Sequence, residues 1–292
     1  YIISQDGNFK SIVCDLNSNE YTHYVSFSYT GTSKIQNDVI IETEKDTILY
    51  DKYNYTNFEL DSAKYIKIFD EWRYQFPSTS FTFNANSADV YGLLPFYIQP
   101  DDIDDLCPDS TYVIPIAIKS VSSYQIKKEK SNALLRIFVK NKFAETSKNT
   151  TYGMKGYRGE GSMSGNSIGS SKVVYPLSAN AVRFFVGLEN PPAKNPVPED
   201  INRISARIII NDDHSIQIEP YKPFAGLLDI EMLTPPADQD DFPWTNIYEE
   251  TPPKFQNGNI GQRFLMYYRY RIKDGNGNWG DWIYMREILN RV

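Results

Sequence analysis

The chain has 292 residues, of which 41% are hydrophobic and 14% aromatic, and its formal net charge is -7 at pH 7. Nucleic-acid binding requires a clustered positive surface that releases counterions from phosphates, so this acidic balance argues against a nucleic-acid partner. No apolar run reaches about 18 residues, and the sequence therefore contains no candidate transmembrane helix. The length favours two domains over a single core.

Short segments with alternating apolar and polar residues dominate the first half of the chain. This period of two is typical of half-buried strands, and turn-forming residues separate the segments. The predicted strands cover residues 21–28, 39–43, 80–83, 113–119 and 134–140. Helical periodicity is weak: we expect a short helix over residues 62–69 with Asp61 as its N-cap, and an acidic turn over residues 101–106.

Pro115 lies inside the strand predicted at residues 113–119. Because proline cannot donate a ladder hydrogen bond, we expect this strand to lie at a sheet edge or to carry a bulge. The polar connection from Ser120 to Asn132 is longer than a usual hairpin turn. We therefore expect the strands that flank it to belong to different sheets of a sandwich.

The composition changes abruptly after Lys140. Six glycines occur between Gly153 and Gly169, with almost no aliphatic residues. This composition predicts a linker or a long surface loop over residues 146–172. We place the domain boundary near residue 145, which gives a first domain of residues 1–145 and a second domain of residues 146–292.

The second half also predicts strands, at residues 182–187, 204–210 and 215–219. The last two form an antiparallel hairpin candidate, because their isoleucines share one face and can meet across the pair. A longer strand is predicted over residues 263–272. Its core face carries Phe264, Met266, Tyr268, Tyr270 and Ile272, and its wet face carries Arg263, Leu265, Tyr267, Arg269 and Arg271. Turn dipeptides at residues 274–277 lead to a return strand over residues 282–289. The whole chain is predicted to be all-β.

Several segments resemble a known family of two-domain lipoproteins encoded in Bacteroidetes polysaccharide-utilisation loci, whose halves are domains of unknown function. The segments are LLPFYIQPDDIDDLCPD, DSTYVIPIAIKSVSSYQIKKEKSNALLRIFVKN, VVYPLSANAVRFFVG, RFLMYYRYRI and WIYMREILNR. The resemblance implies an immunoglobulin-like N-terminal β-sandwich and a C-terminal antiparallel β-barrel or sandwich. It also implies lipid anchoring through a lost N-terminal cysteine and a place at the outer-membrane surface. The start at Tyr1 without Met fits a chain whose export signal has been removed.

Residues that could support catalysis or hold a metal are few. With only His23 and His214, catalytic triads and His-rich metal sites are nearly excluded, and we expect a packed imidazole and a solvated turn residue respectively. Asp274, Asn276 and Asn278 have calcium-loop spacing, but Trp279 stands where that loop requires glycine. We predict no catalytic residue, metal or cofactor.

Two acidic clusters, at residues 101–105 and 238–241, favour exposed turns over cation sites. The two cysteines, Cys14 and Cys107, are too few for a disulfide scaffold, and the sequence leaves their pairing open.

Tryptophans near predicted loops are the candidate ligand-binding residues. Trp244 lies in a loop with Asp240 and Asp241, Trp279 flanks a turn, and Trp282 begins a strand. Indole rings in such places can stack on sugar faces while nearby carboxylates bind hydroxyls. The alternative is that these rings cap the ends of the β core.

These patterns favour a non-enzymatic surface lipoprotein that binds or presents glycan, with a polysaccharide or oligosaccharide as ligand and an outer-membrane transporter as partner. The first alternative is a protein-interaction or adhesin-like module that uses an exposed edge such as the Pro115 strand. The second is a glycoside hydrolase or its accessory, which requires two carboxylates facing each other across a deep cleft.

Overall fold

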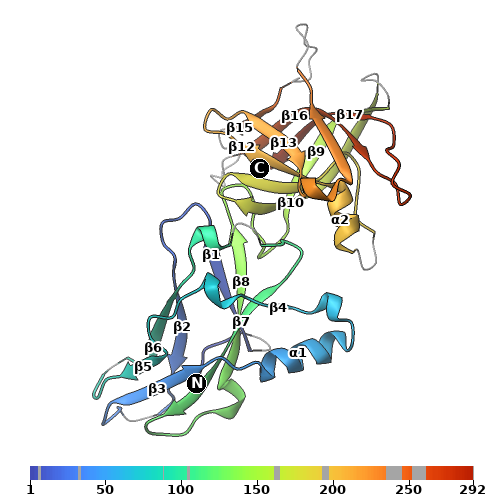
Figure 1. Cartoon of the computed structure of the whole chain (residues 1–292). Coiled ribbons are helices and arrows are strands. Elements are labelled where there is room, and N and C mark those ends of the chain that lie inside the picture. Colours follow the sequence, from blue (N-terminus) through green and yellow to red (C-terminus); the bar gives the residue numbers. More distant parts are fainter. Residues whose placement is uncertain are drawn as a thin grey trace. The chain divides into compact units, whose positions relative to one another are not determined.

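The computed structural model describes residues 1–5, 8–31, 34–87, 89–103, 106–160, 165–192, 197–234, 245–251 and 261–291. The chain has the predicted all-β, two-domain fold (Figure 1). It divides into two compact units, Tyr1–Lys140 and Asn141–Val292, whereas the boundary was expected near residue 145. Within the described ranges, no helix is both long enough and apolar enough to cross a membrane.

Among its described residues, the N-terminal unit contains two sheets and one α-helix, α1 (Ile48–Phe58). The larger sheet has the order β1-β8-β7-β3-β5, with β4 paired to β7, and β2 pairs with β6 in the smaller sheet. The strands are β1 (Phe9–Asp15), β2 (Thr22–Ser28), β3 (Val39–Glu44), β4 (Lys67–Ile68), β5 (Ser80–Phe83), β6 (Tyr91–Tyr97), β7 (Tyr112–Val121) and β8 (Asn132–Lys140).

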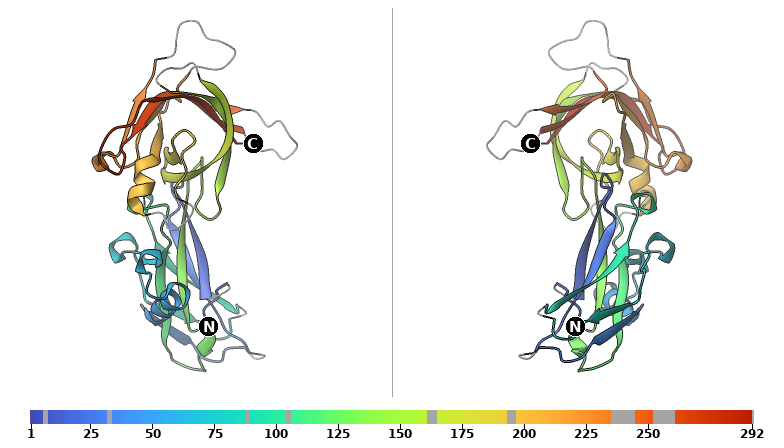
Figure 2. Two further views of the ribbon diagram at one scale, coloured as in Figure 1. Left: turned by 90° about the vertical axis from the view of Figure 1, so that its right-hand side faces the viewer. Right: turned by 90° about the vertical axis from the view of Figure 1, so that its left-hand side faces the viewer.

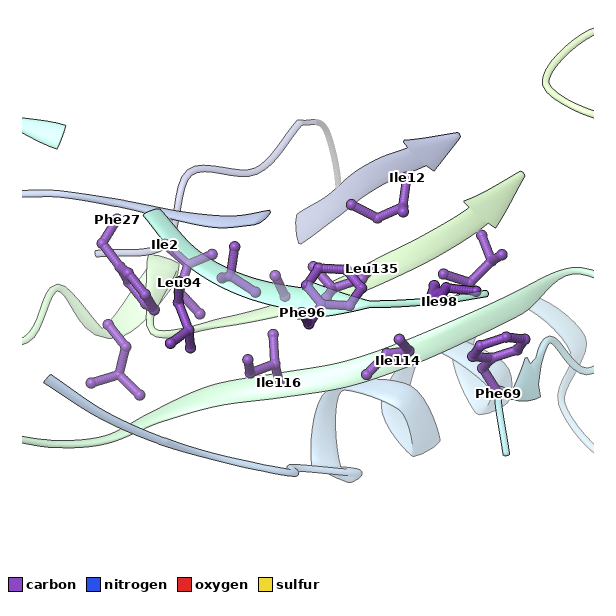
Figure 3. Close-up of a cluster of buried hydrophobic side chains, with 14 of the residues drawn as sticks. Ile2, Ile12, Phe27, Phe69, Leu94, Phe96, Ile98, Ile114, Ile116 and Leu135 are labelled. Atoms are coloured by element: carbon purple, nitrogen blue, oxygen red, sulfur yellow. The ribbon is translucent and has the colours of Figure 1, made fainter. Parts of the chain in front are cut away.

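Apolar side chains from both sheets form the core of the N-terminal unit, as in a sandwich. Leu94 and Phe96 of β6 pack with Ile114 and Ile116 of β7 and with Leu135 of β8 (Figure 3). All five side chains are buried. The alternation that predicted these strands therefore marks the residues that hold the two sheets together.

The strand that contains Pro115 is central, so the expected edge position is wrong, whereas the alternative expectation of a bulge is confirmed by a register shift against β3 between Glu42 and Thr43. β7 pairs with β8 on one side, and with β4 at Tyr112–Val113 and β3 at Ala117–Val121 on the other. Pro115 falls between the β4 and β3 segments. No strand pairs with β7 on that side at Pro115, so the missing N–H of proline costs no hydrogen bond. The expectation of different sheets for the two strands is also wrong, because β7 and β8 pair directly across the Ser120–Asn132 connection.

The helix of the N-terminal unit does not lie at the expected residues. Residues 62–64 form only a short 3₁₀ turn, and the α-helix is α1. Its buried Asn54 accepts a hydrogen bond from the Ile66 main-chain N–H at 3.0 Å and donates one to the Ile66 carbonyl at 3.3 Å. This long-range pairing fixes the helix, and it leaves no periodic signal in the sequence.

The C-terminal unit is an antiparallel sheet with the order β13-β12-β11-β10-β9-β17-β16-β14, and β15 also pairs with β16. It curves into a nearly closed barrel, and helix α2 (Pro198–Ile204) lies beside it (Figure 2). The strands are β9 (Thr150–Glu160), β10 (Asn166–Ser178), β11 (Ala181–Phe185), β12 (Ser205–Ile210), β13 (Ile216–Pro220), β14 (Leu228–Met232), β15 (Ile247–Thr251), β16 (Gly261–Ile272) and β17 (Ile283–Arg291).

The glycine-rich segment is not a linker, which corrects the prediction for residues 146–172. It forms most of the β9–β10 hairpin, with Lys155 opposite Gly169 and Tyr152 opposite Lys172. At Gly156, an added Cβ would lie 2.1 Å from the main-chain oxygen of Arg286 on β17. Glycine is therefore required at that position for close strand approach and gives no evidence of a flexible loop.

The hairpin and the long strand of the second half are confirmed. β12 and β13 pair with Ile208 opposite Ile218 and Ile210 opposite Ile216. On β16, Phe264, Met266, Tyr268 and Tyr270 are fully buried. The residues between them lie on the other face of the strand, where the candidate site is found.

A charged pair inside the barrel was not predicted. The Lys172 ammonium lies 2.8 Å and 3.0 Å from the carboxylate oxygens of the fully buried Glu287. The Tyr268 hydroxyl donates to the same carboxylate at 2.8 Å. Burial lowers the pKa of Lys172, and the Glu287 charge opposes that shift. The pair joins β10 to β17 on the inner face of the sheet.

Candidate functional site

Trp279 and Trp282 follow a tight turn between β16 and β17. The Asp274 carboxylate accepts hydrogen bonds from the main-chain N–H groups of Asn276 and Asn278, both at 2.8 Å. The hydrogen bond from the Asn278 N–H is the main cause of a lowered Asp274 pKa. Gly277 supplies the positive φ of +86° that the turn needs. The acidic and amide residues that have calcium-loop spacing therefore close a hairpin.

The two tryptophans alternate with cations on one surface, which we call the aromatic–cation ladder. Its members are Tyr284, Arg269, Trp282, Arg271, Trp279 and Lys273. The Trp282 ring centre lies 4.4 Å from Cζ of Arg269 and 4.5 Å from Cζ of Arg271. The Trp279 ring centre lies 4.9 Å from Cζ of Arg271 and 4.7 Å from Nζ of Lys273. Each indole therefore contacts two cations.

The strand period places these residues together. Arg269 and Arg271 occupy alternate positions of β16, opposite in phase to the buried Tyr268 and Tyr270, so they share the outer face. Register pairs Arg269 with Tyr284 of β17, and the Tyr284 hydroxyl accepts a hydrogen bond from Arg269 at 2.9 Å. β16 and the residue just after it supply the cations, while β17 and the residues just before it supply the rings.

Two carboxylates of β14 complete the surface. Asp229 pairs in register with Arg271, and its Oδ2 lies 2.8 Å from Nη2 and 3.0 Å from Nε of that arginine. Glu231 pairs with Arg269, with Oε2 2.7 Å from Nε. The hydrogen bond that Arg269 donates to the Glu231 carboxylate is the main cause of the raised Arg269 pKa. These contacts hold both guanidinium groups in a fixed orientation.

The ladder remains open to solvent. Trp279 is 38% exposed, and the side chains of Arg271 and Glu231 are 32% and 47% exposed. Cations cover part of each indole, so less ring surface is open to stacking than the sequence-based hypothesis assumed. The surface offers fixed N–H donors, carboxylate acceptors and ring edges side by side, which suits a ligand rich in hydroxyl groups.

The predicted site residues divide into two groups. The structure brings Trp279 and Trp282 together on the ladder, whereas Trp244, Asp240 and Asp241 lie outside the described residues. Sequence reasoning missed the arginines as site residues and did not consider the acidic side chains of β14. The available signal was the alternation of Asp229 and Glu231 in the segment LDIEM, which matches the alternating arginines of β16.

The histidines and cysteines form no nucleophilic site in the described part of the chain. His23 Nε2 lies 3.6 Å from the Cys14 sulfur, and burial lowers the His23 pKa. Burial raises the pKa of the Cys14 thiol to about 12, so it is not activated as a thiolate. Cys14 and Cys107 are both free thiols. His214 is an exposed turn residue with a positive φ of +67°.

Two domain models, one N-terminal and one C-terminal, match almost the whole chain. The N-terminal domain model matches residues 1–125, and the C-terminal model matches residues 131–290. Among curated proteins, none is significantly similar to the chain.

Solved structures with the same fold come from Bacteroides. A protein of unknown function from Bacteroides ovatus is 17% identical with a TM-score of 0.71, and the alignment covers 99% of this chain and 92% of that one. A multidomain protein including DUF1735 from the same species is 15% identical with a TM-score of 0.71, covering 100% and 94%. An auxiliary nutrient binding protein from Bacteroides thetaiotaomicron is 14% identical with a TM-score of 0.61, covering 99% and 92%.

Proposed function

Because the chain belongs to the two-domain family whose N-terminal and C-terminal models it matches, we propose that it binds glycan through the aromatic–cation ladder. The observation that carries the proposal is the arrangement on one open surface of two indoles, three cations and two carboxylates. The proposed role is non-enzymatic capture or presentation of a polysaccharide.

The ladder has the chemical groups that sugar recognition requires. Guanidinium N–H groups donate to sugar hydroxyls, and the carboxylates of Asp229 and Glu231 accept from them. The indole edges offer apolar surface to sugar C–H groups. The ion pairs already fix the arginine side chains, so binding loses little of their rotamer entropy. An auxiliary nutrient binding protein with this fold supports binding as the role of the chain.

The proposed setting is the outer-membrane surface, where the protein is held by an N-terminal lipid and works beside an outer-membrane transporter. This setting follows from the family resemblance of the sequence. Cell fractionation tests the location, and a pull-down from envelope extracts tests the partner. The alternative of an interaction module using an exposed Pro115 strand has lost its basis, since β7 lies inside its sheet.

Affinity electrophoresis in gels that contain starch, xylan, β-glucan, mannan or pectin tests the proposal. We expect at least one polysaccharide to retard the intact chain, and Arg271→Ala to reduce that retardation because it removes contacts to Trp279, Trp282 and Asp229. Phe224→Ala is the matched control, since Phe224 is fully exposed in the same unit. Equal retardation of Arg271→Ala and the intact chain would overturn the assignment to the ladder.

A further inference from the structure

A hollow of about 330 Å³ opens in the N-terminal unit over Pro115, and we call it the Pro115 hollow. Its lining includes Thr43, Glu44, Lys45, Glu71, Tyr74 and Pro115. The volume lies in the range of ligand sites, roughly 300–1,000 Å³. Apolar core residues form its floor and polar side chains form its rim, which is the usual build of a small-ligand site.

The hollow exists because β7 has no neighbouring strand at Pro115 on the side away from β8, which pairs there through Leu134. β4 pairs with β7 only at Tyr112 and Val113, and β3 pairs with it only from Ala117 onward. The rim is fixed on the β3 side, where the main-chain N–H and the hydroxyl of Thr43 both donate to the Thr79 carbonyl at 2.8 Å. The gap therefore results from the pairing of the sheet. Pro115 has no main-chain N–H to donate to a further strand, so no strand is favoured to fill the gap.

Trp72 is the exposed aromatic residue next in sequence to the lining of the Pro115 hollow. It directly follows Glu71, a lining residue, and it is 67% exposed. The ring centre lies 4.1 Å from Cζ of Arg73, whose side chain is buried and hydrogen-bonded to Asp70 at 3.3 Å. A buried guanidinium thus orients the indole, while most of its surface stays free for stacking.

Polar groups at the rim are available to a ligand. In the part of the chain that the structure describes, neither the Glu44 carboxylate nor the half-buried Tyr74 hydroxyl has a hydrogen-bond partner. Lys45 and Glu71 form an ion pair at 2.6 Å across the rim. Two free oxygen groups and one fixed charge pair provide acceptors and donors at the mouth of the hollow.

We propose that the Pro115 hollow and Trp72 form a second glycan-binding site, with the indole stacking on a sugar ring and Glu44 and Tyr74 binding its hydroxyls. The ligand class rests on the proposed function, but the site shares no residue with the ladder. Each unit of the chain then carries its own binding surface, and a polysaccharide can engage either one.

Isothermal titration tests this site. The intact chain is titrated with the polysaccharide that retards it most strongly in affinity electrophoresis. We expect Trp72→Ala and Glu44→Gln each to weaken binding, the former roughly tenfold. Tyr55→Ala is the control, since Tyr55 is 66% exposed on α1 and contacts no ring or cation among the described residues. Circular dichroism establishes that each variant is folded.

The outcomes separate the two sites. Weaker binding in Trp72→Ala and Glu44→Gln, with Tyr55→Ala unchanged, supports the hollow whatever Arg271→Ala does. Unchanged binding in both hollow variants overturns it, and a loss confined to Arg271→Ala leaves the ladder as the site. Absence of binding by the intact chain to every polysaccharide overturns both.

Discussion

Trp72 in the N-terminal unit and Trp279 and Trp282 in the C-terminal unit meet solvent in different ways. Trp72 contacts one buried arginine and is 67% exposed, whereas each ladder tryptophan contacts two cations and Trp279 is only 38% exposed. An indole near a loop is therefore not by itself a stacking platform. What its faces already contact decides whether it can receive a sugar ring or serves to orient polar neighbours.

The interiors of the two units also differ in how much charge they contain. The main core of the N-terminal unit is apolar, while the barrel of the C-terminal unit encloses the Lys172–Glu287 pair. Glu287 lies on β17, the strand that also supplies Tyr284 to the ladder. The C-terminal unit thus uses fixed charges on both faces of one sheet, and the predictions below test how far it depends on them.

Lys172→Met should have the largest effect on stability. Removing one partner of a buried ion pair leaves an uncompensated charge and costs about 3–5 kcal/mol of unfolding free energy. Guanidinium unfolding should show this loss in the transition of the C-terminal unit alone. Lys155→Met, at an exposed position of β9, is the control. The double variant with Glu287→Leu should recover much of the loss, and a Lys172→Met protein as stable as the wild type would contradict the dependence on buried charge.

Gly156→Ala should have a smaller but clear effect. The added Cβ would meet the Arg286 oxygen at 2.1 Å, and such overpacking costs about 1–3 kcal/mol. The new methyl group forces β9 away from β17, so thermal unfolding of the C-terminal unit should begin at a lower temperature. Gly169→Ala is the matched control in the same hairpin, because its nearest neighbour is 3.8 Å away. Equal melting temperatures for the two variants would refute close approach as the reason for this glycine.

Acidification should weaken the N-terminal unit through His23. Burial lowers the folded-state pKa of His23 below the ordinary histidine value of about 6.5, so the folded state binds fewer protons than the unfolded state. Stability is therefore complete above the unfolded pKa, falls as the pH drops below about 6.5, and levels off below the folded pKa. The melting temperature between pH 8 and pH 5 measures this slope, which His23→Gln should flatten. If the melting temperature of His23→Gln depends on pH as strongly as that of the wild type, other titratable groups cause the dependence.

The sequence predicted the parts of the fold that periodicity encodes. Alternation identified the long strand of β16 and assigned its buried face correctly, but the face predicted to be wet is only partly exposed, and Leu265 on it is buried. Glycine content misled at β9–β10, because composition does not distinguish a flexible loop from a strand that must approach another backbone closely. Helix α1 was missed because its one fully buried residue is the polar Asn54, which bonds to Ile66, while the apolar residues that it packs against the core, Leu49, Tyr50 and Tyr53, are only partly buried.

The candidate sites depend on long-range pairing that single segments do not reveal. The ladder needs the register that sets Asp229 opposite Arg271, more than 40 residues later in the chain. Trp72 lies in a short 3₁₀ turn, Glu71–Arg73, and its orientation depends on the burial of Arg73 by the surrounding fold. Trp279 and Trp282 could be selected from the sequence, but Trp72 was not, and the charges that decide the roles of all three could not be predicted.

The central claim, that this chain binds glycan through exposed aromatic and charged surfaces, is tested most directly by isothermal titration of the intact chain with starch, xylan, β-glucan, mannan and pectin. We predict a saturable heat with at least one polysaccharide, reduced in the double variant Trp72→Ala and Arg271→Ala but retained in the double control Tyr55→Ala and Phe224→Ala. No saturable heat with any of them, or equal heats in the two double variants, would contradict it.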